Sequence, residues 1–214
     1  MLSMLSAAQL AQKLLQIKAI KLRPQTPFTW ASGIKSPIYC DNRITLSHPA
    51  IRNEIKAAFA DKAGNYSQAN CIAGVATAGV AHGALLADAL DLPYVYVRSK
   101  AKEHGRQNLI EGELPEHAKV IVVEDLISTG GSSIQAVHAL REAGAEVLVV
   151  FAIFSYGFQK AIDNFDSAHC PFISLSNYEA LLVEAESSSY ISESEKSTLE
   201  EWNASPETWY DKHF

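Results

Sequence analysis

Apolar runs and amphipathic stretches alternate along the middle and the C-terminal half of the chain. Runs rich in β-branched residues predict buried strands, and stretches with apolar residues three and four apart predict helices. The expected order is strand 71–75, helix 79–90, strand 94–97, strand 119–124, helix 131–143, strand 146–154, helix 157–166 and strand 172–175. This alternation predicts an α/β fold, a mainly parallel sheet flanked by helices, with ligands at the carboxyl ends of the strands.

The first third of the chain lacks this alternation. Ser6 with Gln9 is typical of a capping box and predicts an N-terminal helix, followed by short strands at 28–30 and 38–40 and a helix from about 47 to 64. We expect one domain with three parts. These are an N-terminal helix and small outlying elements (1–66), the α/β core (67–176) and C-terminal helices (177–214).

The run 122–133 carries the most specific chemistry. A buried strand, a loop of small hydroxylated residues and a helix follow in order, which places open backbone N–H groups and a positive helix end around Ser128 to Ser132. A Gly/Ser turn alone is weak evidence, because such turns follow strands in every doubly wound protein. The adjacent acids Glu124 and Asp125 change this, since buried carboxylates need hydrogen-bond donors, and a ribose diol supplies them. The run matches neither the P-loop nor the dinucleotide fingerprint.

A basic segment at 98–106 contrasts with the acidic chain. It holds four cationic residues and one acid, whereas the whole chain has a formal net charge of −6. A solvated surface loop is the ordinary interpretation of such a run. However, the roughly 20 residues between the flanking strands exceed the length of a normal connection, and Gly105 and Gly112 are candidate hinges. We therefore predict that this segment is a lid that closes on an anion-binding site.

Composition narrows the function classes. The chain has 214 residues, 48% of them hydrophobic, and its acidic balance argues against a nucleic-acid partner. Three widely spaced cysteines favour neither a disulfide framework nor a zinc site. No secretory signal or apolar run of membrane-spanning length is present, so we expect a cytoplasmic protein with no membrane partner.

The run 122–133 closely resembles the motif by which type I phosphoribosyltransferases bind 5-phosphoribosyl 1-diphosphate (PRPP). Segments 28–39, 73–80 and 97–105 resemble the orotate phosphoribosyltransferases, in the same order along the chain. The resemblance implies the type I phosphoribosyltransferase fold with an N-terminal hood over the base site. It further implies PRPP and orotate as substrates, Mg²⁺ carried mainly by PRPP rather than by a dedicated protein site, and a homodimer whose lid is shared between subunits.

The resemblance also assigns residues. Lys102, Arg98, His104 and Asp125 are the expected catalytic groups, and Arg98, Lys102 and His104 would contact the diphosphate from the partner subunit. The ribose 5-phosphate part of PRPP would be bound by Glu124, Asp125, Leu126, Ile127, Ser128, Thr129, Gly130, Gly131 and Ser132. A second loop would hold the diphosphate through Ala76, Thr77, Ala78 and Gly79. Ser128 and Lys35 are the expected orotate contacts.

Three positions depart from the family pattern. Ala31 and Ala78 stand where other orotate enzymes have lysines, and Tyr156 stands where some relatives have arginine, which leaves open the group that holds the orotate carboxylate. A phosphoribosyltransferase for another base, a PRPP-responsive regulator and a nucleotide-binding structural module are the alternatives. The N-terminal 27 residues are too short and too weakly basic for a regulator's DNA-binding extension, and a structural module would not need the lid.

Overall fold

A six-stranded sheet forms the centre of the chain. The computed structural model describes residues 5–30, 33–99 and 109–214. The strands are β5 (Cys71–Val75), β6 (Tyr94–Val97), β7 (Ile110–Glu111), β8 (Lys119–Ile127), β9 (Glu146–Ser155) and β10 (Phe172–Asn177), in the order β10-β9-β8-β5-β6-β7. All neighbours are parallel except β6 and β7. The predicted mainly parallel sheet is confirmed.

Two strand predictions need correction. β7 lies in a segment expected to be a polar connection, where its two residues pair with the edge strand β6. β8 continues to Ile127 instead of ending at 124, because Leu126 and Ile127 still pair with β9. Glu124 and Asp125 therefore lie inside the C-terminal end of β8, and the phosphate loop begins only after Ile127.

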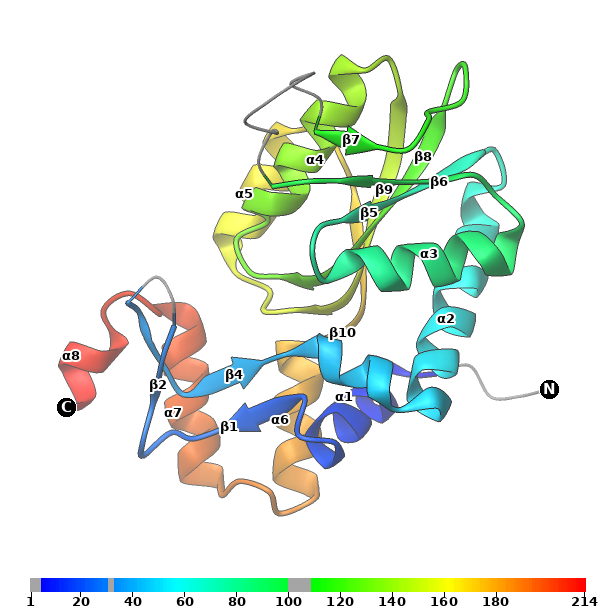
Figure 1. Cartoon of the computed structure of the whole chain (residues 1–214). Helices are drawn as coiled ribbons and strands as arrows, with labels where there is room; N and C mark the ends of the chain where they lie inside the picture. The colour runs from blue at the N-terminus through cyan, green and yellow to red at the C-terminus, as the bar shows by residue number, and fades with distance from the viewer. Residues whose placement is uncertain (1–4, 31–32, 100–108) are drawn as a thin grey trace.

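Each face of the sheet is covered by its own helices. Along β8, Val120 and Val122 pack in one apolar cluster with α4 (Gly131–Glu142) and α5 (Gln159–Ser167). Ile121 and Val123 pack in the other cluster with α2 (Pro49–Ala63) and α3 (Gly79–Leu90). Figure 1 shows α4 and α5 on one side of the sheet and α3 on the other. This strict alternation is what a strand buried on both faces requires.

The N-terminal elements form a small layer outside the sheet, as predicted. The Ser6–Gln9 capping box starts α1 (Ala7–Gln16). The two predicted short strands do not pair with each other: β1 (Ile20–Leu22) pairs with β4 (Ile38–Cys40), and β2 (Phe28–Thr29) pairs with β3 (Lys35–Ser36). Burial accompanies this pairing, because Ile20 and Ile38 are both fully buried in the apolar cluster that also holds Leu10 and Leu14 of α1. A 3₁₀ helix, Asn42–Ser47, leads into α2.

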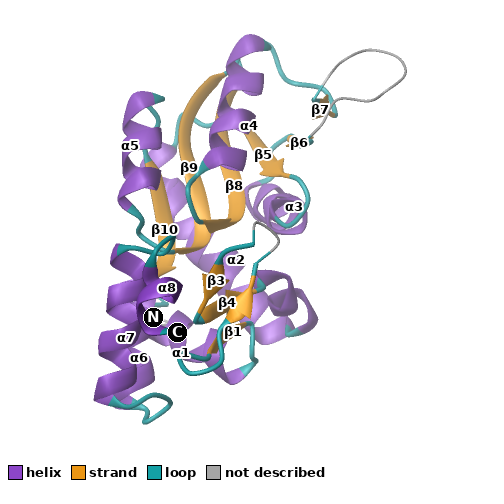
Figure 2. Cartoon of the chain, turned by 90° about the vertical axis from the view of Figure 1, so that its left-hand side faces the viewer, coloured by secondary structure: helices purple, strands orange, loops and turns teal. Residues whose placement is uncertain are grey.

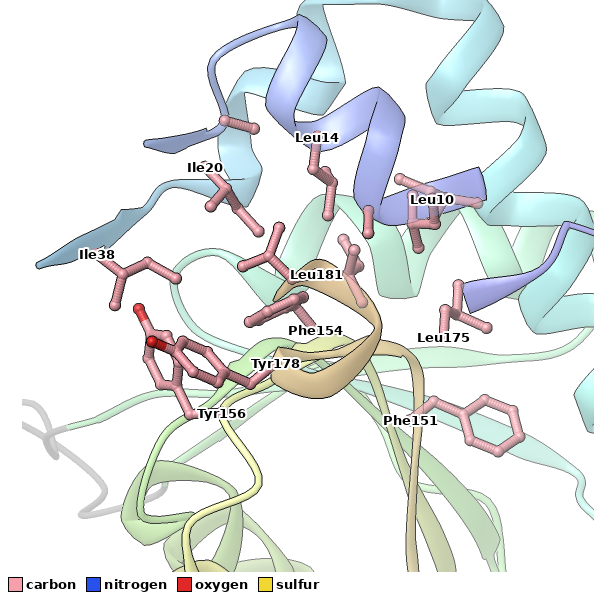
Figure 3. Packing of buried hydrophobic residues seen from close by; sticks show 14 of the residues in the cluster. Leu10, Leu14, Ile20, Ile38, Phe151, Phe154, Tyr156, Leu175, Tyr178 and Leu181 are labelled. Atoms are coloured by element: carbon pink, nitrogen blue, oxygen red, sulfur yellow. The ribbon is translucent and has the colours of Figure 1, made fainter. Parts of the chain in front are cut away.

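Three helices close the chain: α6 (Tyr178–Ser187), α7 (Glu193–Ala204) and α8 (Trp209–His213). The second begins after a capping box formed by Ser192 and Glu195. Figures 1 and 2 both show these helices beside β1 and β4, so the two ends of the sequence share one layer. Figure 3 shows Leu10 and Leu14 of α1 facing Leu181 of α6 across this apolar layer.

An aromatic cluster joins this layer to the sheet. We use the name for Trp30, Tyr156, Phe158, Tyr178 and Trp202. The fully buried Trp202 ring lies 5.6 to 5.8 Å, centroid to centroid, from each of the other four. The cluster thus links the N-terminal layer, the end of β9, the α5 cap and α7.

Within the described ranges, no helix has both the length and the apolar character needed to cross a bilayer.

Replacing Trp202 with alanine should lower the free energy of unfolding by about 3–5 kcal/mol, because a large cavity would open where the aromatic cluster meets α7. Denaturant unfolding followed by circular dichroism measures this. Val183→Ala on the 54% exposed face of α6 is the matched control and should change stability by less than about 0.5 kcal/mol. Equal effects of the two substitutions would show that the cluster does not hold the layers together.

Candidate active site

The candidate site lies at the carboxyl ends of β5, β8 and β9. Three predicted segments reach this edge from separate parts of the sequence: the loop after β5, the end of β8 with the start of α4, and the residues after β9. Parallel strands bring these segments to the same edge, as the α/β pattern predicted.

Glu124 is held by donors from its own segment. Its carboxylate accepts hydrogen bonds from Ser132 Oγ at 3.0 Å, Ser133 Oγ at 3.4 Å and the Asp125 backbone N–H at 3.0 Å. The side chain is almost completely buried, and burial together with the charge of Asp125 raises the pKa of Glu124 to about 8. Burial also raises the pKa of Asp125. The raised pKa values mean that the two carboxyl groups together readily keep at least one proton. Hydrogen-bond donors from a ligand would favour the ionised carboxylates instead.

The start of α4 is open to an anion. Gly130 precedes the helix in a left-handed conformation (φ 79°), and no side chain caps the helix N-terminus. Thr129, Gly131 and Ser132 are exposed, and Asn164 of α5 fixes the loop by donating to the Thr129 carbonyl at 2.8 Å. The first-turn N–H groups of an uncapped helix, with its positive dipole end, suit a phosphate.

The predicted binding segment spans the end of a strand and the loop that follows it. Leu126 and Ile127 belong to β8, and the Ile127 side chain is fully buried. Ser128 to Ser132 forms the loop and the first turn of α4 that follow the strand.

The predicted diphosphate loop lies beside Arg98. Ala76, Thr77 and Ala78 line a hollow of about 590 Å³ together with Arg98 and Arg43. The Ala76–Thr77 peptide is cis. Arg98 also pairs with Glu111 of β7 at 3.3 Å, so the strand that the sequence did not predict helps to place this cation. The other guanidinium at this hollow is also paired, because Arg43 donates to both carboxylate oxygens of Asp41, at 2.6 and 2.9 Å.

Gly79 has a packing role that the sequence did not reveal. A Cβ atom at this position would lie 2.3 Å from the Val123 carbonyl oxygen and 3.1 Å from the Cα of Glu124. The absence of a side chain therefore lets α3 lie directly against β8, next to the acid pair.

Ser128 and Lys35 lie apart. Ser128 lines a hollow of about 380 Å³ with Trp30, Phe158 and the 203–208 segment. Lys35 Nζ instead donates to Thr29 Oγ1 at 2.8 Å and lies 5.6 Å from the ring centroid of Tyr210. Lys35 is not among the residues that line this hollow.

The predicted lid residues Lys102 and His104 lie outside the described residues. The same holds for Lys100 of the basic segment and for Ala31. The residues on either side of this segment are described. The Arg98 N–H donates to the Leu109 carbonyl at 2.8 Å, which extends the antiparallel pairing of β6 and β7 by one hydrogen bond.

One residue that positions the site was missed. Asn42 is fully buried, and its side-chain amide donates to the Asp125 carbonyl at 2.8 Å, which ties the N-terminal layer to the acid pair. No sequence signal marks it, because the two residues are 83 positions apart.

Comparison with known proteins settles the family. Residues 44–177 match the model of the phosphoribosyl transferase domain. An orotate phosphoribosyltransferase from Listeria innocua is 52% identical over 202 residues, which span 94% of this chain and 97% of the relative. The chain belongs to the orotate phosphoribosyltransferase family.

Solved structures agree. The orotate phosphoribosyltransferase of Aeropyrum pernix superposes with a TM-score of 0.74 at 27% identity and covers 86% of this chain and 99% of that one. The UMP synthase of Leishmania donovani gives a TM-score of 0.77 at 24% identity, over 92% of this chain but only 42% of its own longer chain. This second likeness shows a shared fold.

Gly79→Ala should destabilise this family member by about 1–3 kcal/mol, because the new methyl group would push α3 away from β8. Gly131→Ala is the matched control: the nearest atom to its Cβ would be 4.0 Å away, so stability should be unchanged. Thermal unfolding of both variants tests this. A stable Gly79→Ala protein would show that the close approach of helix and strand is not needed.

Glu124→Gln should change how stability depends on pH. The pKa of Glu124 is raised from 4.5 in the unfolded chain to about 8 in the fold. The proton held by the fold therefore stabilises it fully below about pH 4.5, and this contribution is lost as pH rises toward 8. The difference in unfolding free energy between wild type and Glu124→Gln should fall from pH 5 to pH 8 by more than about 1 kcal/mol.

Urea unfolding across this pH range measures the difference, with Glu113→Gln at an exposed position as the control. If the wild type and Glu124→Gln keep a constant difference, the folded carboxyl does not hold its proton more tightly than the unfolded one.

Proposed function

We propose that this chain transfers the 5-phosphoribosyl group of PRPP to N1 of orotate, giving orotidine 5′-monophosphate and diphosphate in pyrimidine nucleotide synthesis. The observation that carries the proposal is the 52% sequence identity with an orotate phosphoribosyltransferase over 94% of this chain. The acid pair beside an uncapped helix N-terminus supports it, since these are the groups a phosphorylated ribose needs.

The proposal gives each end of the ribose its own partners. The 5′-phosphate would accept hydrogen bonds from the N–H and hydroxyl groups of the segment 128–132. The ribose hydroxyls would donate to Glu124 and Asp125, which adjoin that segment and are held in place by Ser132 and Asn42. Two fixed ends of one sugar would determine where its C1′ atom lies, which is the main requirement for an in-line displacement.

Electrostatic stabilisation would supply the rest of the rate. As the C1′–O bond breaks, the electron pair leaves with the diphosphate, positive charge grows on the ribose, and orotate N1 forms the new bond and loses its proton. Arg98, which lines the same hollow as Ala76, Thr77 and Ala78, would offset the growing negative charge. Lys102 and His104 would join it from the lid, with the partner subunit of a cytoplasmic homodimer contributing them.

Mg²⁺ belongs to the proposal as a companion of PRPP. Among the described residues, no group of three or more potential ligand side chains comes together. Glu124 and Asp125 supply carboxylate oxygens at the ribose end, which fits an ion held mainly by substrate oxygens with few protein ligands. When bound, Mg²⁺ would neutralise charge on the leaving diphosphate.

A spectrophotometric assay of the purified protein with PRPP, Mg²⁺ and orotate tests the proposal, run beside uracil, hypoxanthine and xanthine. Consumption of orotate alone is the expected result. Turnover of a purine base would assign a different phosphoribosyltransferase. Tight PRPP binding without turnover of any base would instead indicate a regulator.

Lys102→Ala should lower kcat by about 100-fold or more while changing PRPP affinity much less, because its proposed contact strengthens as diphosphate leaves. The control is Lys119→Ala, at the opposite end of β8, whose ion pair with Glu146 is exposed. Steady-state kinetics and PRPP titration separate the two effects. A loss of PRPP binding with kcat retained would remove the proposed transition-state role.

A further inference from the structure

A separate hollow lies in the N-terminal layer, away from the candidate active site. It has a volume of about 720 Å³ and is formed where the end of α1 and the strand β1 meet the turn after α6. Among the described residues, it shares no lining residue with the two hollows at the candidate site. Figures 1 and 2 both show β1 and the turn between α6 and α7 on the side of this layer that faces away from the sheet.

Three cations line this hollow: Lys18, Lys21 and Arg23. None of the described lining residues is acidic, although the whole chain has a formal net charge of −6. Within the described part of the chain, none of the three cations forms an ion pair. Single exposed cations are ordinary on a protein surface, but three unpaired ones around one concave space create a positive potential that favours an anion.

The local structure explains how the three side chains come together. In β1, Lys21 lies between two buried residues, so the alternation of a strand places Lys21 and Arg23 together on the opposite face. The Arg23 guanidinium lies 5.0 Å from the ring centroid of Phe28, which limits its freedom. Lys18 follows the end of α1 in a left-handed conformation (φ 59°). A helix C-terminus favours a cation such as Lys18, but it does not account for the two on the strand.

Two neighbouring acids are already bonded to other cations. Lys21 acts electrostatically on Asp41, but both carboxylate oxygens of Asp41 accept hydrogen bonds from Arg43, at 2.6 and 2.9 Å. Glu186, at the end of α6, accepts a hydrogen bond from Lys196 at 2.5 Å. Neither carboxylate therefore neutralises the hollow.

The uncharged lining groups suit a nucleoside. Tyr190 presents a ring that is 46% exposed, and an exposed aromatic face can stack on a base. The side chains of Gln12, Gln16 and Ser189 are exposed and supply donors and acceptors for the edge of a base or for a sugar hydroxyl. The volume of the hollow lies within the range of sites for small molecules of this size.

We propose that this hollow is a second ligand site, which binds a nucleoside polyphosphate with its phosphates on Lys18, Lys21 and Arg23 and its base on Tyr190. The inference does not depend on the proposed function, because none of these residues belongs to the candidate active site. A ligand bound here would contact the N-terminal layer and not the reacting groups.

Calorimetric titration with ATP measures the affinity, and hydrogen exchange with and without ATP locates the site. We expect protection of residues 12–23 and 184–192. The triple variant Lys18→Gln/Lys21→Gln/Arg23→Gln should raise the Kd for ATP at least about 10-fold, because it removes the charged donors. Tyr190→Ala should raise the Kd for ATP about fivefold or more and the Kd for inorganic triphosphate by less than about twofold, since only ATP has a base to stack.

The matched control is Lys56→Gln/Lys62→Gln/Lys212→Gln, which removes the same charge at positions that do not line the hollow. Its Kd for ATP should be unchanged, and melting temperatures check that each variant is folded. If the triple variant does not fold, the different responses of Tyr190→Ala to ATP and to triphosphate still test the site.

Three results would overturn the inference: no protection of residues 12–23 by ATP, equal Kd values for the triple variant and the control, or equal affinities of the wild type for ATP and inorganic triphosphate. The orotate assay tests the proposed function separately. Failure of the wild type to consume orotate would reject that function and leave the second site standing.

Discussion

The candidate site depends on the hydrogen bonds that the buried carboxyl group of Glu124 accepts. A carboxyl group at the end of a central strand loses its hydration, and three donors from the same segment compensate: the hydroxyls of Ser132 and Ser133 and the N–H of Asp125. These bonds join β8 to the first turn of α4. They therefore fix the spacing between the acids and the open helix N-terminus, which is the spacing a phosphorylated ribose would have to match.

The rest of the fold serves to bring other groups to this point. Gly79 lets α3 lie against β8, so the diphosphate loop reaches the same edge of the sheet. Asn42 ties the N-terminal layer to Asp125, and the aromatic cluster ties the same layer to the residue that follows β9. Apolar burial supplies the stability of these joints, while the hydrogen bonds set their geometry.

Local patterns in the sequence accounted for the sheet and the cradle. A strand buried on both faces, an N-terminal capping box and a strand–loop–helix order depend on neighbouring residues, so Lys119–Val123, Ser6 with Gln9 and Ser128–Ser132 could be interpreted without a structure. Long-range contacts could not. The pairing of Ile20 with Cys40, the Asn42–Asp125 bond and the β6–β7 pairing arise from tertiary packing. The surroundings of Tyr156 also needed the structure, because its stacking with Trp30 and Phe158 and its edge contact with Trp202 join three distant parts of the chain.

A crystal structure of the protein with bound PRPP and Mg²⁺ tests the central claim most directly. We expect the 5′-phosphate on the first-turn N–H groups of α4, the ribose hydroxyls on Glu124 and Asp125, and the diphosphate between the 76–79 loop and Arg98. A ribose that leaves Glu124 bonded only to its serines, or a 5′-phosphate bound away from α4, would contradict the account.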